Sequence, residues 1–279
     1  MIWIVIVAFL FLLLIGCPLI FSIGFPSVLY FVISGNTFLL SIIPERFMIG
    51  MDSFVMMAMP LFIFMGEVMA RGGITDDLID FCNFFVGRLR GGLAYTNVLA
   101  STFFAGISGS ALSDIASEGV VLVPIMEKSG YKREYASALT VVTAMQAPLI
   151  PPSVPGLTVA GVGGLSVGAI FMGGLGPGLL LAFLCCLVVF VQARRYDFPV
   201  YKVKFTWGGL LKVCLKTLPG LLTPLIVILG IYTGIFTATE AAAIACAYAF
   251  FLTFVVRRFP LKNLGGILKS TVRLTSAAY

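Results

Sequence analysis

The chain has 279 residues, of which 60% are hydrophobic and 11% charged, and its mean hydropathy is +1.10. Soluble domains carry about 25% charged residues, so the composition excludes a soluble globular protein and predicts an all-α polytopic membrane protein with about seven transmembrane helices. The formal charge of +6 does not indicate nucleic-acid binding, because the basic residues cluster at the ends of apolar runs, and the absence of histidine excludes Ser-His catalysis and most zinc sites.

Residues 1–70 are predicted to contain the first transmembrane helices. Two apolar runs, 1–16 and 18–34, are followed by a short polar loop around residues 44–46 and by a third apolar run, 53–70. A membrane crossing needs roughly 20 apolar residues, so each run is expected to cross once.

Residues 71–90 predict an amphipathic helix that lies along the membrane interface. Three aspartates between positions 76 and 80 alternate with large apolar residues, a pattern typical of interfacial helices. Thr75 is expected to cap this helix, with the aspartates favourably placed in its first turn. Glu67, about one turn before the end of the preceding run, is also expected at the interface.

Residues 91–127 predict a re-entrant helical hairpin. The apolar run is broken at Ser108-Gly109-Ser110, and it is too long for one crossing of about 20 residues but short for two. Basic residues flank both ends, which places both ends on the cytoplasmic side. Non-helical backbone at membrane depth persists only where it is buried in protein or lines a watery cavity. The Ser-Gly-Ser tip is therefore the first candidate binding site.

Residues 131–193 predict a broken helix followed by a return helix. Four prolines between positions 148 and 155 cannot continue a helix, because proline lacks the backbone donor and clashes with the preceding turn. We expect unwound backbone in this break, with its carbonyl groups facing a cavity near the middle of the membrane.

The remaining residues complete a topology with one basic face. Residues 194–216 contain six basic residues and one acidic residue, Asp197, which predicts a cytoplasmic loop. Residues 217–257 are expected to form an out-and-back helix pair, and residues 258–279 a helical arm on the surface. In this arrangement every basic cluster is cytoplasmic and the N-terminus is periplasmic.

The hairpin tip and the proline break together form the candidate site. Serine hydroxyls and freed carbonyl groups are hard oxygen ligands suited to a sodium-sized cation, whereas helix N-termini favour an anionic group of a substrate. The structural alternative is a Gly/Ser kink that serves helix packing, with Asp114 as its cap.

Asp114 and Glu118 lie four residues apart, on one face of the second leg of the hairpin. Carboxylates inside a membrane are costly and usually functional. The alternative is that they are hydrated near the cytoplasmic surface or paired with Lys128 or Arg133. Glu240 is expected to cap the start of its own helix.

Glycines four residues apart predict close contacts between helices. The pairs are Gly164/Gly168, Gly174/Gly178 and Gly230/Gly234. The glycines from 161 to 164 have no lysine after them and no strand before them, so we do not expect a phosphate loop.

Further motifs run through nearly the whole chain. They are Met59-Pro60-Leu61-Phe62-Ile63, Gly66-Glu67, Phe104-Ala105-Gly106-Ile107-Ser108-Gly109-Ser110-Ala111, Gly130-Tyr131, Ile150-Pro151-Pro152-Ser153, Pro177-Gly178-Leu179-Leu180 and Gly234-Ile235-Phe236-Thr237-Ala238-Thr239-Glu240-Ala241. In this order and spacing they resemble the large membrane subunit of a tripartite ATP-independent periplasmic (TRAP) transporter. The resemblance implies one inverted repeat of an elevator-type carrier in the bacterial inner membrane. The activity it implies is sodium-driven import of a small organic anion, such as a C4-dicarboxylate or a sugar acid.

The resemblance also implies partners and site residues. The partners are a small four-helix membrane subunit and a periplasmic binding protein that delivers the substrate; no cofactor other than the sodium ion is implied. Sodium binding is expected at Ser108, Gly109, Ser110, Pro151, Pro152 and Ser153, and substrate contacts at Ser110, Asp114 and Gln146. The chain departs from the family at Gln146-Ala147, where small, glycine-containing sequence is usual, and at Ala238, where proline is usual.

One departure bears on function. The large subunit of the family has two inverted repeats, whereas this chain has one Ser-Gly-Ser tip and one Pro-Pro-Ser break. We therefore expect the chain to need a second repeat and not to transport alone. The alternatives are a single-component sodium/anion symporter of similar hairpin architecture, a scaffold without transport activity, and an intramembrane hydrolase using Ser108 or Ser110, for which the sequence offers no base.

Overall fold

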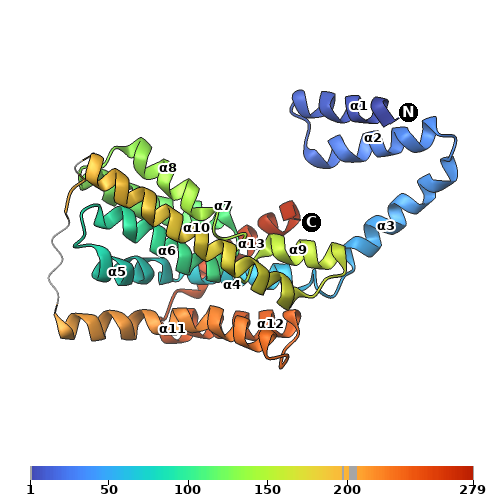
Figure 1. Ribbon diagram of the computed structural model, residues 1–279. Helices are drawn as coiled ribbons and strands as arrows, with labels where there is room; N and C mark the ends of the chain where they lie inside the picture. Colours follow the sequence, from blue (N-terminus) through green and yellow to red (C-terminus); the bar gives the residue numbers. More distant parts are fainter. Residues whose placement is uncertain (1, 197, 201–205, 279) are drawn as a thin grey trace. The chain divides into compact units, whose positions relative to one another are not determined.

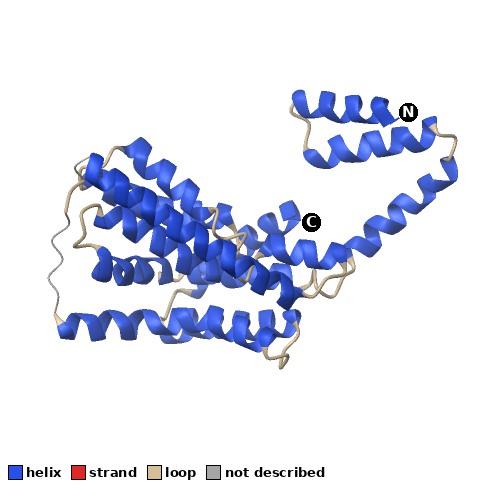
Figure 2. Cartoon of the chain, in the orientation of Figure 1, coloured by secondary structure: helices blue, strands red, loops and turns tan. Residues whose placement is uncertain are grey.

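The computed structural model describes residues 2–196, 198–200 and 206–278, and within them all regular secondary structure is helical (Figures 1 and 2). Three segments of these residues are long and apolar enough to cross a membrane: Val167–Arg195, Trp207–Tyr232 and Ala238–Val256. The predicted class, an all-α polytopic membrane protein, is confirmed. The other apolar helices are shorter than a full crossing, so helix length alone does not account for seven crossings.

The helices follow one another in this order: α1 (Ile2–Leu14), α2 (Leu19–Ile33), the 3₁₀ turn η1 (Thr37–Ser41), α3 (Ile42–Met51), α4 (Ala58–Arg71), α5 (Ile74–Val86), α6 (Gly92–Ser108), α7 (Ala111–Lys128), α8 (Arg133–Ala144), α9 (Val154–Gly163), α10 (Val167–Arg195), α11 (Trp207–Tyr232), α12 (Ala238–Phe250), the π-helical turn η2 (Phe251–Val256), the 3₁₀ turn η3 (Leu261–Asn263) and α13 (Leu264–Ala278). They form two compact units, residues 1–53 and 54–279.

The first unit consists of an antiparallel pair, α1 and α2, followed by α3. The chain turns between α1 and α2 at Gly16, whose φ of +82° is in the left-handed region. The prediction of a polar loop around residues 44–46 is wrong, because these residues lie near the start of α3. Pro44 is tolerated there, since the N–H groups of a first turn have no partner within the helix.

The core of the second unit surrounds α4. Nine of its 14 residues are buried, and α4 packs against α12, α13 and α6. Met59, Met65 and Met69 are completely buried in the largest apolar cluster. A helix that is buried on most of its surface is held by neighbouring helices, so the short α4 is an internal support for the hairpin that follows.

Helix α5 buries one face against α6 and α11. The prediction that Thr75 caps it is wrong. Gly73 occupies the cap position, at a φ of +79°, and the Thr75 hydroxyl is buried without a hydrogen-bond partner among the described residues. Asp77 is also buried and pairs with Lys216, at 2.6 Å between Nζ and Oδ1, and with Arg257. This face therefore joins α5 to two later parts of the chain.

The basic loop predicted for residues 194–216 is shorter in the structure. Helix α10 continues to Arg195 and α11 begins at Trp207, so Lys212 and Lys216 are helical. Arg194 and Arg195 are helical as well, at the end of α10, and the remaining charged residues of that prediction, Asp197, Lys202 and Lys204, lie outside the described residues.

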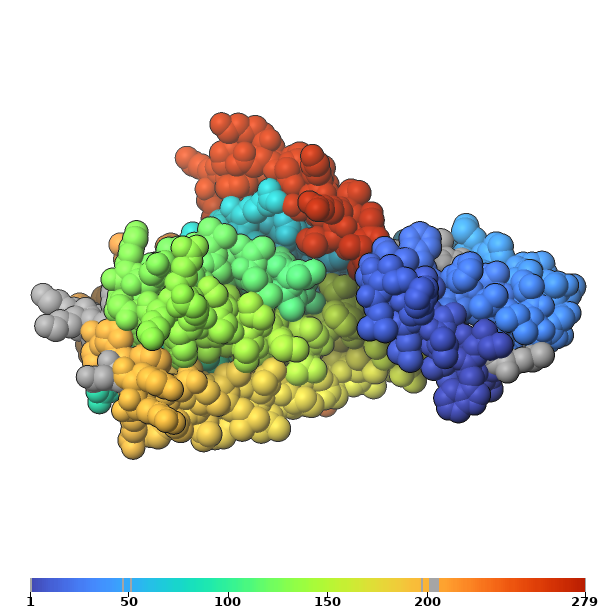
Figure 3. All heavy atoms as spheres, turned by 90° about the horizontal axis from the view of Figure 1, so that it is seen from above, coloured from blue at the N-terminus to red at the C-terminus, as the bar shows by residue number. Residues whose placement is uncertain are grey.

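The C-terminal helices pack on the same core. Helices α11 and α12 form a pair, and the Tyr248 hydroxyl donates to the Pro219 carbonyl at 2.9 Å. Glu240 caps α12 in a reciprocal capping box with Thr237, which confirms the predicted cap. Helix α13 lies on α4, as the red and cyan segments of Figure 3 show, and it buries Ile267.

Candidate functional site

The hairpin is formed by α6 and α7, which run antiparallel and turn at Gly109. Gly109 has a φ of +59°, and its N–H donates to the Ala105 carbonyl at 3.1 Å, which closes the end of α6. Ser110 is extended and precedes α7. The backbone thus leaves helical geometry at the Ser108–Ser110 segment that the sequence singles out.

The proline break lies between α8 and α9. Helix α8 ends at Ala144, three residues before the end predicted, and α9 begins at Val154. The Ser153 hydroxyl accepts from the Gly156 N–H at 3.0 Å and donates to the Pro148 carbonyl at 2.6 Å. Ser153 therefore caps α9 and holds the preceding non-helical segment against it.

The hairpin tip and the proline break are in direct backbone contact. The Val154 N–H donates to the Gly109 carbonyl at 3.1 Å. The position that a Cβ would occupy on Gly109 lies 2.1 Å from the Pro152 oxygen, and the one on Gly66 of α4 lies 2.9 Å from Ser108 Cα. The structure thus brings the Ser108–Ser110 segment against the Pro152–Val154 segment, with α4 behind the tip.

The Ser108 hydroxyl is held from two directions. It accepts from the Ser110 N–H at 3.2 Å and donates to the Asp114 carboxylate. Asp114 is completely buried, and its second oxygen, Oδ2, has no hydrogen-bond partner among the described residues. Asp114 therefore places a buried carboxyl group directly behind the tip.

The sequence alternatives for Asp114 and Glu118, hydration or pairing with Lys128 or Arg133, are wrong. Both side chains are buried, at 0% and 1% exposure, and neither forms an ion pair within the part of the chain that is described. Arg133 instead faces Glu127, at 4.0 Å.

Of the three residues predicted to contact a substrate, only Ser110 is partly exposed. Gln146 is completely buried; its Oε1 accepts from the Thr102 hydroxyl at 2.6 Å, and its Nε2 has no partner among the described residues. In this conformation neither Asp114 nor Gln146 is accessible to a molecule from outside the protein.

Glu67, expected at the membrane interface, is buried between α4 and the hairpin. Its carboxylate accepts from Arg71 Nε at 3.2 Å, and its other oxygen lies 3.5 Å from the Ser113 hydroxyl of α7. The side chain is only 12% exposed. Glu67 therefore contributes to the contact between α4 and the hairpin.

Sequence reasoning missed a buried polar network beneath the tip. Ser101 Oγ lies 2.5 Å from Glu118 Oε2 and 3.0 Å from Thr143 Oγ1, and Thr143 Oγ1 lies 2.9 Å from Asn97 Oδ1. Asn97 Nδ2 donates to Thr140 Oγ1 at 2.8 Å. The signal was present, because Asn97 and Ser101 are four residues apart and Thr140 and Thr143 three apart, so that each pair lies on one helical face.

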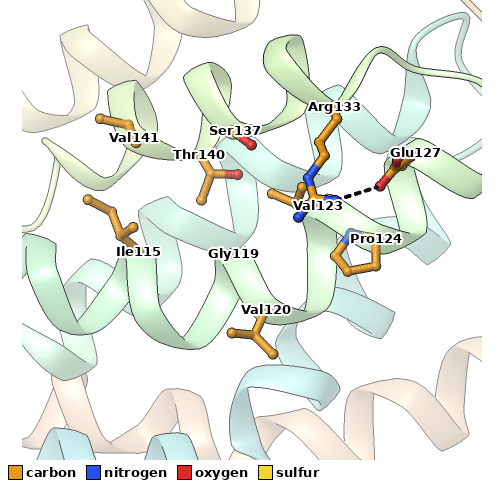
Figure 4. A pocket seen from close by; sticks show the side chains of 10 residues that line it. All are labelled: Ile115, Gly119, Val120, Val123, Pro124, Glu127, Arg133, Ser137, Thr140 and Val141. Carbon is orange, nitrogen blue, oxygen red and sulfur yellow. Dashed lines mark ion pairs between the residues drawn. The ribbon is translucent and has the colours of Figure 1, made fainter.

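A separate groove lies on the outside of α7 and α8 (Figure 4). It has a volume of about 570 Å³, and the Arg133–Glu127 ion pair crosses one end of it. Of the polar network, only Thr140 lines it, and no residue of the tip or the break does. The groove is therefore not the predicted ion and substrate site.

Comparison with known proteins gives a consistent result. The sequence matches the family "Tripartite ATP-independent periplasmic transporter, DctM component" over residues 6–278. The Salmonella typhimurium protein YgiK is 36% identical over 96% of the chain and 62% of its own length. Two Vibrio cholerae proteins are also similar. The sialic acid TRAP transporter large permease protein SiaM is 35% identical over 95% of the chain and 62% of its own length. The C4-dicarboxylate TRAP transporter large permease protein DctM is 34% identical over 90% of the chain and 56% of its own length. The chain thus spans about three-fifths of the length of these relatives.

Proposed function

This chain belongs to the DctM family of TRAP transporter components, and from that premise we propose that it is part of the large permease subunit of a sodium-coupled importer of organic acids. SiaM and DctM, two of the relatives, are named as transporter permeases and not as enzymes, which rules against the hydrolase alternative. The proposed location is the bacterial inner membrane, with the N-terminus in the periplasm. The proposed partners are a second repeat of the large subunit, a small four-helix membrane subunit and a periplasmic binding protein.

The observation that carries the proposal is the backbone contact between two interrupted helical elements. At the tip the Ser108 hydroxyl lies 3.5 Å from the Ser110 carbonyl oxygen, and the Gly109 carbonyl between these two residues accepts from the Val154 N–H of the break at 3.1 Å. Hydroxyl and carbonyl oxygens are suitable ligands for a sodium ion, and the carboxyl group of Asp114 lies directly behind Ser108. A cation bound here would join the two elements.

The substrate class follows from the same geometry. The N-terminus of α7 begins at the tip, and its free N–H groups favour a carboxylate. Relatives are named for sialic acid and for C4-dicarboxylates, both of which carry carboxylates. We assign the substrate contact to Ser110, whereas Asp114 and Gln146 would reach a substrate only after the hairpin moves.

The test measures uptake by the complete transporter reconstituted in vesicles with a sodium gradient, using labelled C4-dicarboxylate and sialic acid. Ser108→Ala is expected to raise the sodium concentration for half-maximal uptake by about ten- to a hundredfold, because a hydrogen bond or ligand contact to a charged group contributes about 1.5–3 kcal/mol. Ser117→Ala is the control, since the Ser117 hydroxyl donates to the Ser113 carbonyl of its own helix at 2.8 Å.

Unchanged sodium dependence in Ser108→Ala, or full uptake without sodium, would contradict the proposed ion site. Omission of the binding protein distinguishes the tripartite transporter from the single-component symporter. Uptake that persists at the same rate without it would favour the single-component symporter.

A further inference from the structure

Four buried side chains from α7, α6 and α8 form a continuous chain of oxygen atoms. The order is Glu118 Oε2, Ser101 Oγ, Thr143 Oγ1 and Asn97 Oδ1, with separations of 2.5, 3.0 and 2.9 Å. Each of the four side chains is at most 1% exposed. These distances are all within hydrogen-bond range, so each of the three contacts needs a proton between its oxygens.

The hydroxyl groups cannot supply all three protons. Ser101 and Thr143 carry one each, and an amide oxygen carries none. Two oxygen atoms that approach to about 3 Å without an intervening proton repel each other through their lone pairs. The Thr143 hydroxyl also lies 3.0 Å from the Leu139 carbonyl and 3.2 Å from the Thr140 carbonyl of its own helix, so it has no second proton to give to the chain. With the Asn97 amide oxygen facing Thr143, we assign the third proton to the carboxyl group of Glu118. In that case Glu118 donates to Ser101, Ser101 to Thr143, and Thr143 to Asn97.

The count depends on which side of the Asn97 amide faces Thr143, and two neighbouring contacts favour the amide oxygen on that side. The Thr140 hydroxyl donates to the Ala136 carbonyl at 2.9 Å, so its oxygen accepts from Asn97 Nδ2 at 2.8 Å. Nδ2 also lies 3.8 Å from the Met126 sulfur, a weak acceptor. The amide nitrogen is therefore on the Thr140 side, and the amide oxygen faces Thr143.

The surroundings of Glu118 also favour the neutral acid. The titratable groups that face it are Asp114 on its own helix and Cys82 on α5. Glu67 of α4 reaches α7 at Ser113 and is already paired with Arg71. Helices α6 and α8 offer only hydroxyl and amide groups at this level. An ionised carboxylate without a positive partner is costly in such an interior.

We propose that Glu118 is a proton-binding site inside the hairpin, one turn below Asp114 and distinct from the sodium site at the tip. The bound proton completes the hydrogen-bond chain that joins both legs of the hairpin to α8. Its loss leaves one contact in this chain without a proton and places an unpaired negative charge beside Asp114. Opening of the hairpin away from α8 and release of this proton are therefore linked.

Infrared difference spectroscopy of the complete transporter in lipid vesicles at neutral pH tests this directly. The native protein is expected to show the carbonyl stretch of a protonated carboxylic acid, and Glu118→Gln is expected to lose one such band. The matched control is Glu127→Gln on the same helix, whose carboxylate is exposed and faces Arg133; it should lose none. Asp114→Asn separates any contribution of the neighbouring carboxyl group.

A second variant retains Glu118 itself. Ser101→Ala removes the acceptor of its proton, so the acid band is expected to move to higher frequency and still disappear in the double variant with Glu118→Gln. A native spectrum in which Glu118 contributes only ionised carboxylate bands, with or without sodium, overturns the proposal. A band that is lost in Glu118→Gln but unmoved in Ser101→Ala overturns the hydrogen-bond chain. Neither infrared readout depends on transport, so a failure of the proton-site proposal can be distinguished from a failure of the proposed sodium-coupled transport.

Discussion

Gly109 shows how one residue can hold the candidate site together. Its left-handed backbone turns the hairpin, and its missing side chain admits the Pro152 carbonyl. A Cβ at this position would meet that oxygen at 2.1 Å, closer than any real contact. The residue is thus required twice, once for its dihedral angles and once for the space it leaves.

Gly109→Ala is therefore expected to separate the tip from the break and to lower the melting temperature. The strain of a left-handed alanine costs roughly 1–2 kcal/mol, and the clash adds to it. Gly164→Ala is the matched control, because Gly164 has a φ of +63° but nothing within 4 Å of its Cβ position. Thermal unfolding in detergent measures both. If the melting temperature falls equally in the two variants, the close contact with Pro152 does not contribute to stability.

At this scale the sequence predicts the site partly. The rule that interrupted backbone must be buried at membrane depth identifies Ser108–Ser110 and the proline break, which the structure brings together. It does not identify Asn97, Ser101 or Thr143, because the register between α6, α7 and α8 depends on packing across more than 40 residues of sequence. Polar residues on one helical face have many possible partners, and only tertiary structure selects among them.

At the scale of elements, α10 supports the proline break. The sequence predicts that Gly174 and Gly178 serve contacts between helices, but the structure places the non-helical segment against them instead. A Cβ on Gly174 would lie 2.4 Å from the Leu149 carbonyl oxygen, and one on Gly178 would lie 2.6 Å from the Ile150 side chain. Glycines four residues apart form a flat surface on a helix. An unwound segment can pack closely on such a surface, just as a second helix can.

Gly174→Ala is expected to displace the break and lower the melting temperature, whereas Gly173→Ala, which has open space at its Cβ position, is not. Alanine in an open helical position raises stability by about 0.5–1 kcal/mol relative to glycine, so the two variants should shift in opposite directions. Thermal unfolding of both, with the native protein as reference, measures the difference. A stabilised Gly174→Ala variant would mean that Leu149 can move away without cost.

Secondary structure is predicted well where a local signal is strong and poorly where it is weak. The capping box of Thr237 and Glu240 is contiguous in sequence and correctly anticipated. The helix α3 was missed because Pro44 and Glu45 suggest a loop, although both suit a first helical turn. Helix α8 ends three residues before the predicted end because the backbone of the break forms local hydrogen bonds instead of helical ones. The Leu149 and Ile150 N–H groups both donate to the Gln146 carbonyl at 2.9 Å.

Across the whole second unit, Asp77 connects three parts of the chain. Its carboxylate pairs with Lys216 of α11 and with Arg257, and its carbonyl accepts from the Thr217 hydroxyl at 3.0 Å. Arg257 also donates to the Gly72 carbonyl at 3.2 Å. Because Asp77 is 2% exposed, this cluster determines how the last helices are joined to α5.

Asp77→Asn is expected to destabilise the unit by about 1.5–3 kcal/mol, because Asp77 loses its charge-assisted contacts while its partners Lys216 and Arg257, 52% and 21% exposed, can still be hydrated. Asp76→Asn is the control, since Asp76 is the neighbouring aspartate and is exposed. Thermal unfolding and the yield of folded protein after membrane extraction report the effect. If the two variants unfold at the same temperature, the cluster does not stabilise the arrangement.

The Asp77 cluster also has a consequence for synthesis. Arg257 follows Asp77 by 180 residues, and ribosomes add about 5–20 residues per second. The aspartate therefore leaves the ribosome roughly 10–35 s before its arginine exists. At the start of that interval neither Lys216 nor Arg257 has been made, so the Asp77 carboxylate has no final partner until synthesis reaches Lys216 and acquires the second only with Arg257.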